Sequence, residues 1–102
     1  MKKIIYLGNE RKIFEYTSIE KLQKECRKHG IAICGTVTLG RKVTIGEGVT
    51  IGKAVMIGNN TVLGNNVNIG DSISIPDDSV IKDNVIGYIE NNKVIFQLGK
   101  KL

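Results

Sequence analysis

The sequence contains no tryptophan, and its aromatic residues are limited to three tyrosines and two phenylalanines among 102 residues. So few aromatic side chains argue against a catalytic pocket lined mainly by aromatic rings. Proline occurs once, as Pro76, whereas glycine occurs twelve times and isoleucine and valine are frequent. This composition predicts a single β-rich domain whose backbone turns often and whose interior is aliphatic.

Cysteines and long apolar runs are also scarce. Cys26 and Cys34 are too few for a disulfide framework and lack the spacing of metal ligands, which favours free thiols in a reducing compartment. No apolar run approaches the roughly 18 residues of a membrane span, and the lysine-led start meets charge again at Glu10 and Arg11. We therefore expect a cytoplasmic protein without a membrane partner or a bound metal.

The net charge of +5 is not gathered into one basic surface along the chain. Residues 1–30 carry eight Lys and Arg against four Glu, whereas residues 67–84 carry one Lys against four Asp. Nucleic-acid binding would require a basic stripe interleaved with stacking aromatic rings, and the central region has none. We expect no nucleic-acid partner.

Between Ile31 and Asn84 the sequence repeats every six residues through nine hexads. The first position is small or β-branched, and the fourth is glycine in the six central hexads and Cys34, Pro76 or Lys82 near the ends. The third position is always isoleucine or leucine: Ile33, Leu39, Ile45, Ile51, Ile57, Leu63, Ile69, Ile75 and Ile81.

Each hexad predicts one short strand followed by one turn. The first and third residues share one face because strand side chains alternate with period two. The glycine permits a sharp bend, and the two polar residues after it include Asn and Gly, which tolerate positive φ. Three hexads close a triangular coil of eighteen residues, and three coils stack at about 4.8 Å. Residues eighteen apart form core columns, with Ile33 on Ile51 and Ile69, Leu39 on Ile57 and Ile75, and Ile45 on Leu63 and Ile81.

This repeat resembles the hexapeptide-repeat superfamily, whose fold is a left-handed parallel β-helix, and residues 77–95 are similar to the closing segment of bacterial acetyltransferases. Ser79, Val80, Lys82 and Asp83 carry the second similarity, whereas Tyr88 to Asn92 replace the motif that follows in those enzymes. The resemblance implies a homotrimer with sites in the grooves between prisms. It also implies coenzyme A or an acyl-coenzyme A as cofactor if the protein is an enzyme.

The flanking segments predict caps over the two open ends of a short prism. Residues 1–30 contain an alternating stretch around Gly8, Asn9 and Glu10, typical of a hairpin, and then a helix with a Thr17-x-x-Glu20 capping box. We expect Ile19, Leu22 and Cys26 of this helix to cover the first coil, with Lys21, Lys24 and Lys28 in water.

Residues 85–102 predict a second hairpin that turns at Asn91 and Asn92 and closes the last coil. The fold class expected is therefore mainly β. Its parts are an N-terminal cap (residues 1–30), a left-handed parallel β-helix of three coils (31–84) and a C-terminal hairpin cap (85–102).

His29 is the only histidine and the only candidate for a catalytic role. The family resemblance implies a histidine as general base, since imidazole titrates near neutral pH. However, His29 lies at the end of the predicted helix and outside the repeat, where an imidazole also suits the helix C-terminus as a surface residue. Both interpretations stay open.

The corners of the prism offer a second candidate site. Stacking by eighteen places Arg41 over Asn59 and Lys42 over Asn60. These side chains form either a solvated corner with Asn ladders or, together with Lys53, a rim that binds a phosphate-bearing small molecule.

Two functions follow from the sequence. The first is a homotrimeric, non-catalytic scaffold or anionic ligand-binding module related to acyltransferases. The alternative is a minimal acyl-coenzyme A-dependent O- or N-acyltransferase with its site between subunits.

Overall fold

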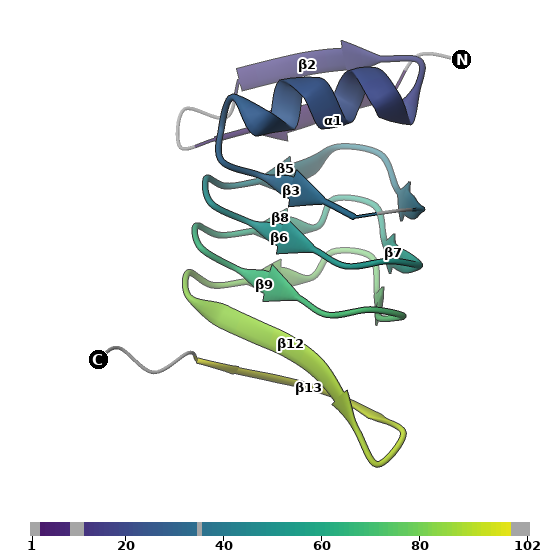
Figure 1. The fold of residues 1–102 in the computed structure, drawn as a ribbon, viewed down its shortest axis with the longest axis vertical. Coiled ribbons are helices and arrows are strands. Elements are labelled where there is room, and N and C mark those ends of the chain that lie inside the picture. Colours follow the sequence, from purple (N-terminus) through teal and green to yellow (C-terminus); the bar gives the residue numbers. More distant parts are fainter. Residues whose placement is uncertain (1–2, 9–11, 35, 99–102) are drawn as a thin grey trace.

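Nine short strands wind into a triangular β-solenoid of three coils, which confirms the expected mainly β fold (Figure 1). The computed structural model describes residues 3–8, 12–34 and 36–98. The chain crosses the front of Figure 1, passes behind and descends with a left-handed sense. The nine strands are β3 (Ala32–Ile33), β4 (Val37–Leu39), β5 (Val43–Ile45), β6 (Thr50–Ile51), β7 (Val55–Ile57), β8 (Val62–Leu63), β9 (Asn68–Ile69), β10 (Ser74–Ile75) and β11 (Val80–Ile81).

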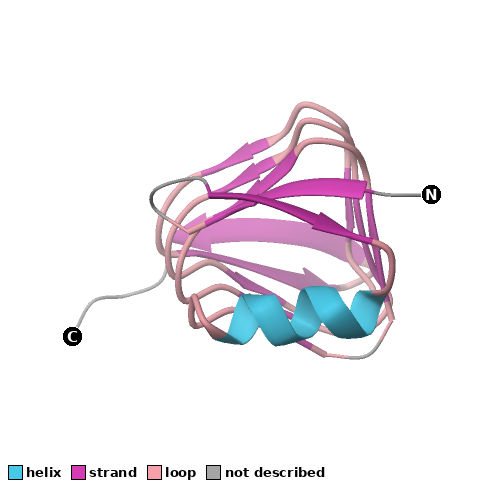
Figure 2. Cartoon of the chain, turned by 90° about the horizontal axis from the view of Figure 1, so that it is seen from above, coloured by secondary structure: helices cyan, strands magenta, loops and turns pink. Residues whose placement is uncertain are grey.

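Strands eighteen residues apart pair in parallel and form the three flat faces of the prism. The stacks are β3-β6-β9, β4-β7-β10 and β5-β8-β11. Their register confirms the predicted columns, because Ile33 pairs with Ile51, Leu39 with Ile57, and Ile45 with Leu63. Seen from above, the coils superimpose as a triangle (Figure 2).

The first and third residues of the hexads point inward and make the core. All nine third-position side chains are buried except Ile33, which is partly buried. Thr61 is the one buried polar residue in this core, and its hydroxyl donates a hydrogen bond to the carbonyl of Pro76 at 3.2 Å. Burying that hydroxyl therefore leaves no unsatisfied donor.

The sixth residue of most hexads turns the corner with a left-handed backbone. Its φ lies between 55° and 69° at Lys42, Gly48, Ala54, Asn60, Asn66, Ser72, Asp78 and Asn84. Asn, Asp and Gly tolerate this region best, which explains why they are frequent at this position.

The glycines at the fourth position have a different role from the one expected. No glycine at the fourth position has positive φ; the described glycines with positive φ are Gly8, Gly30 and Gly48, which lie elsewhere. A Cβ at Gly40 would lie 2.6 Å from the amide nitrogen of Asn59 and 2.7 Å from the carbonyl carbon of Gly58 in the coil below. Glycine is needed because the next coil packs directly against it, and not because the chain bends there.

The N-terminal hairpin is confirmed and extends one face of the prism. Strands β1 (Lys3–Leu7) and β2 (Lys12–Tyr16) are antiparallel, and β1 pairs in parallel with β5. Gly8 begins the turn with φ of 78°, and the rest of the expected turn, Asn9 and Glu10, lies outside the described residues.

Helix α1 (Ile19–Arg27) lies along one side of the first coil (Figure 2). The predicted capping residue, Thr17, is wrong by one position. Ser18 has the extended backbone of an N-cap, and its hydroxyl accepts a hydrogen bond from the Lys21 amide at 3.3 Å. Glu20 therefore occupies the second helical position, where it cannot complete a capping box.

The packing of α1 agrees with the amphipathic pattern. Leu22 and Cys26 are fully buried and Ile19 is partly buried, whereas Lys21, Lys24 and Lys28 are exposed. The Gln23 side chain also donates a hydrogen bond to the carbonyl of Ile33 at 3.1 Å. The helix thus closes the upper end of the core.

The C-terminal hairpin is confirmed, but it continues one face beyond the last coil and does not pair with the other two faces. The expected closure of that coil is therefore only partial among the described residues; residues 99–102 of the expected cap lie outside them. Strand β12 (Val85–Glu90) pairs in parallel with β9 and antiparallel with β13 (Lys93–Leu98). The turn residues Asn91 and Asn92 have φ of 51° and 64°, as a two-residue hairpin turn of type I′ requires. The resulting sheet runs β13-β12-β9-β6-β3.

Candidate functional site

A ladder of Asn and Asp side chains links the coils at the three corners of the prism. The side chain of the fifth hexad residue accepts a hydrogen bond from the main-chain amide eighteen residues earlier. The five bonds measure 2.6–2.9 Å and join Arg41 to Asn59, Glu47 to Asn65, Lys53 to Asp71, Asn59 to Asp77, and Asn65 to Asp83. These side chains satisfy turn amides that a strand ladder does not reach.

The ladder also explains the glycine pattern of the repeat. A glycine occupies the fourth position wherever an Asn or Asp lies nineteen residues later, as in Gly40 with Asn59. The three fourth-position residues that are not glycine fit this rule. The residue nineteen after Cys34 is Lys53, whose side chain is not an acceptor, and Pro76 and Lys82 belong to the last coil. Glycine and Asx thus form one structural unit, repeated between coils.

Four of the five predicted ligand residues share one corner. This Arg41 corner consists of residues 40–42, 58–60 and 76–78. Arg41 and Lys42 are exposed there. The side-chain Oδ1 of Asn59 accepts a hydrogen bond from the Arg41 amide at 2.7 Å, and the Asn60 main-chain amide donates to the Arg41 carbonyl at 2.8 Å. Asn59 and Asn60 therefore hold the corner together, and the two cationic side chains point into solvent.

Lys53 belongs to a different corner, made of residues 52–54 and 70–72. Its amide donates to Asp71 at 2.7 Å, and its side chain is exposed. The flat face of β4, β7 and β10 separates it from the Arg41 corner. One chain therefore does not bring Lys53 together with Arg41 and Lys42.

His29 lies at the third corner, which consists of residues 46–48, 64–66 and 82–84. Its carbonyl accepts a hydrogen bond from the Gly48 amide at 3.1 Å, and its Nε2 lies 3.8 Å from Oε2 of Glu25. A Cβ at Gly8 would come within 2.9 Å of its Nδ1, so the imidazole packs against the N-terminal turn. The His29 side chain is about one fifth exposed, and its carboxylate neighbour Glu25 lies near the end of α1, two residues before the helix ends at Arg27.

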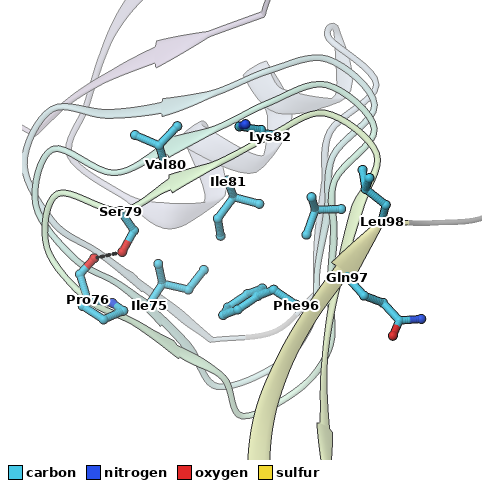
Figure 3. Close-up of a pocket in the computed structure, with 10 residues that line it drawn as sticks. Ile75, Pro76, Ser79, Val80, Ile81, Lys82, Phe96, Gln97 and Leu98 are labelled. Carbon is cyan, nitrogen blue, oxygen red and sulfur yellow. Dashed lines mark hydrogen bonds between the residues drawn. The ribbon is translucent and has the colours of Figure 1, made fainter.

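A cavity that was not anticipated from the sequence lies at the C-terminal end of the prism. It measures about 530 Å³ and is lined by residues of the last coil and of β13. Figure 3 shows Ile75, Ile81 and Phe96 facing one another across it, with Lys82 and Gln97 near its edge. The feature of the sequence that could have indicated this cavity is the loss of glycine at the fourth position in the last two hexads, at Pro76 and Lys82.

A smaller groove of about 240 Å³ follows the His29 corner on the face of β5, β8 and β11. Gly8 lies at one end of it, and Lys82 and Asp83 lie at the other.

Within the described ranges no cluster of three His, Cys, Asp or Glu side chains could hold a metal ion. No helix in that part of the chain is long and apolar enough to cross a membrane.

The two cysteines differ sharply in environment and should differ in reactivity. Burial, with Glu25 nearby as the smaller cause, raises the pKa of the Cys26 thiol to about 12, whereas Cys34 is exposed. Because the thiolate is the reactive form, we expect one thiol per native chain to react with Ellman's reagent at pH 8, and two in denaturant. Fast labelling of both thiols in the native protein would contradict the buried position of Cys26.

Comparison of the chain with protein-family models, curated proteins and solved structures finds no match. The three-coil β-solenoid is therefore established from the chain itself.

Proposed function

We propose that this protein is a non-catalytic member of the hexapeptide-repeat superfamily that assembles as a homotrimer and binds small anionic, phosphate-bearing molecules between its subunits. The observation that carries the proposal is the distribution of the candidate residues over three corners of one prism. Arg41 and Lys42 lie on one corner, Lys53 on another and His29 on the third. A ligand that uses more than one of these corners needs more than one chain.

The flat face between the Arg41 and Lys53 corners favours lateral assembly. Its outward residues in the three strands are Thr38, Met56 and Ser74, and Met56 is 55% exposed at the centre. Methionine is enriched in protein interfaces. If this face packs on the neighbouring prism in a three-fold ring, the corner of one subunit approaches that of the next, and cationic side chains from two chains can meet.

Bound phosphate groups would interact with Arg41 and Lys42 through charge-assisted hydrogen bonds. The Asn59 side chain and the Asn60 main-chain amide, which bond to the backbone of Arg41, would keep both cations at the corner. Two free thiols and the absence of any long apolar stretch support a cytoplasmic location.

Ultracentrifugation and thermal-shift measurements test this proposal. We expect three 11.2 kDa chains to associate side by side. We also expect sugar phosphates, nucleotides or coenzyme A to raise the melting temperature. Arg41→Gln and Lys42→Asn should abolish the rise, and asparagine at 42 keeps the left-handed backbone. Lys93→Gln on the C-terminal hairpin is the matched control. A monomer whose melting temperature responds to none of these anions would refute the proposal.

One contact favours the alternative, a minimal acyl-coenzyme A-dependent acyltransferase. The Glu25 carboxylate lies near the His29 imidazole, as in enzymes where a carboxylate orients a general base. This alternative requires saturable coenzyme A binding, and acyl transfer that is lost in His29→Gln and weakened in Glu25→Gln. The binding-module proposal requires that neither substitution changes the thermal response to anions.

A further inference from the structure

The two ends of the prism differ in how completely they are covered. At the N-terminal end, β1 and β2 continue one face and α1 packs over the first coil with its lysines in water (Figures 1 and 2). At the C-terminal end, β10 and β11 are edge strands of their sheets among the described residues. Only the face of β9 continues, through β12 and β13. Among the described residues, two of the three faces therefore end in an uncovered strand edge at this end, although Ile75 and Ile81 beneath them stay buried.

The hairpin that overhangs this end presents an apolar face toward the axis. Gly87 pairs with Ile69, so it continues the inward column of that face, and Phe96 lies opposite Gly87. The neighbouring inward pairs are Ile89 with Val94 and Val85 with Leu98. Every side chain on this face of the hairpin is therefore apolar or absent.

Much of this apolar surface is in contact with water in the single chain. On the hairpin, Leu98 is 67% exposed and Phe96 41%. Val80, the outward residue of the edge strand β11, is 70% exposed at the rim of the cavity. Together with Ile75 and Ile81 they surround the cavity of about 530 Å³ (Figure 3). A contiguous apolar surface rimmed by polar groups, here Lys82 and Gln97, is typical of a protein interface.

The size and shape of the end face fit a second copy of the same chain. The molecule measures 37 × 28 × 23 Å with the solenoid along its length, so the end spans about 28 × 23 Å. That extent is comparable to the roughly 800 Å² per partner buried in a standard stable interface. Around a two-fold axis, the hairpin overhanging one side of each prism would cover the open side of the other. Such a contact is self-complementary and buries both exposed edges.

Charges at the rim are compatible with the same pairing. Lys82 lies on the last coil with Asp77, Asp78 and Asp83, all of them exposed. Both signs of charge are therefore present at the rim, so Lys82 of one chain has aspartates of the other chain as possible partners. At the other end of the prism, α1 presents Lys21, Lys24 and Lys28 to solvent. A two-fold contact uses the C-terminal end of both chains, so growth through that contact stops at two chains.

We infer that two copies of this protein pack tail to tail through the end face formed by Val80, Phe96, Leu98 and the last coil. The inference does not depend on the lateral trimer. The tail-to-tail contact doubles the number of chains. It gives a dimer if the prisms do not associate side by side, and a hexamer if they form trimers.

Sedimentation equilibrium of the full chain and its variants at micromolar concentration tests the inference. We expect an even number of chains in the native protein, and half that mass in Val80→Lys and Leu98→Lys. Both residues are more than two-thirds exposed, so the fold should tolerate lysine. Ile13→Lys is the matched control, because Ile13 is 62% exposed on the N-terminal hairpin, and it should leave the mass unchanged.

The possible outcomes separate this contact from lateral assembly. Met56→Lys should reduce a hexamer to a tail-to-tail dimer, and a dimer should be unaffected by it. Circular dichroism confirms that each variant is folded. An odd number of chains in the native protein, or no loss of mass in folded Val80→Lys and Leu98→Lys, would overturn the inference.

Discussion

Gly58→Ala is expected to destabilise the protein by about 3 kcal/mol, at the upper end of the cost of overpacking a core. A Cβ at this position would lie 2.5 Å from the amide nitrogen of Asp77 and 2.7 Å from the carbonyl carbon of Pro76. Both atoms are backbone of the last coil, so relief requires that coil to move away. That movement would weaken the Asn59–Asp77 hydrogen bond as well.

Gly70→Ala is the matched control at the same position of a hexad. The nearest atom to its Cβ is the Gly87 carbonyl oxygen at 3.3 Å, and no Asn or Asp follows nineteen residues later. We expect a loss of less than about 1 kcal/mol. Urea denaturation of both variants measures the difference, and equal losses would show that the close approach of the coils is not what requires glycine.

Ile51→Ala is expected to cost about 2–5 kcal/mol of unfolding free energy, as for other large-to-small changes in a closed core. The side chain is fully buried in the middle coil, where it stacks between Ile33 and Ile69. Coils above and below limit collapse of the resulting cavity. Chemical denaturation monitored by circular dichroism gives the change directly.

The neighbouring substitution Thr50→Ala provides the control for Ile51. Thr50 belongs to the same strand but faces solvent in register with Ala32 and Asn68. Its removal should change the unfolding free energy by no more than about 0.5 kcal/mol. If both variants were equally destabilised, the inward and outward assignment of the strand would be wrong.

The period of six was sufficient to predict most of the fold. Nine consecutive Ile or Leu residues at the third position can share one interior only if each hexad turns the chain by the same angle. The stacking of Ile45 on Leu63 follows from this period, whereas the two hairpins followed from alternation around turn residues and the buried face of α1 from its amphipathic pattern. Local patterns were reliable here because every repeat imposes the same geometry.

Other features depended on the positions of particular atoms in space. The helix N-cap shifted from Thr17 to Ser18 because backbone geometry, not spacing alone, decides which hydroxyl reaches the Lys21 amide. The need for glycine at position 40 comes from Asn59, eighteen residues away from Arg41 in the coil below. A linear pattern contains both residues but not the distance between them.

The sequence by itself determined the repeat, the inward column and the polarity of the corners, since these depend on alternation and on the conformational preferences of single residues. Only the tertiary structure decided that Arg41, Lys53 and His29 lie on three separate corners, and that β10 and β11 are edge strands in the part of the chain that the structure describes. The physical reason is that exposure is a property of packed surfaces. It depends on which strands remain without neighbours once the chain has closed on itself.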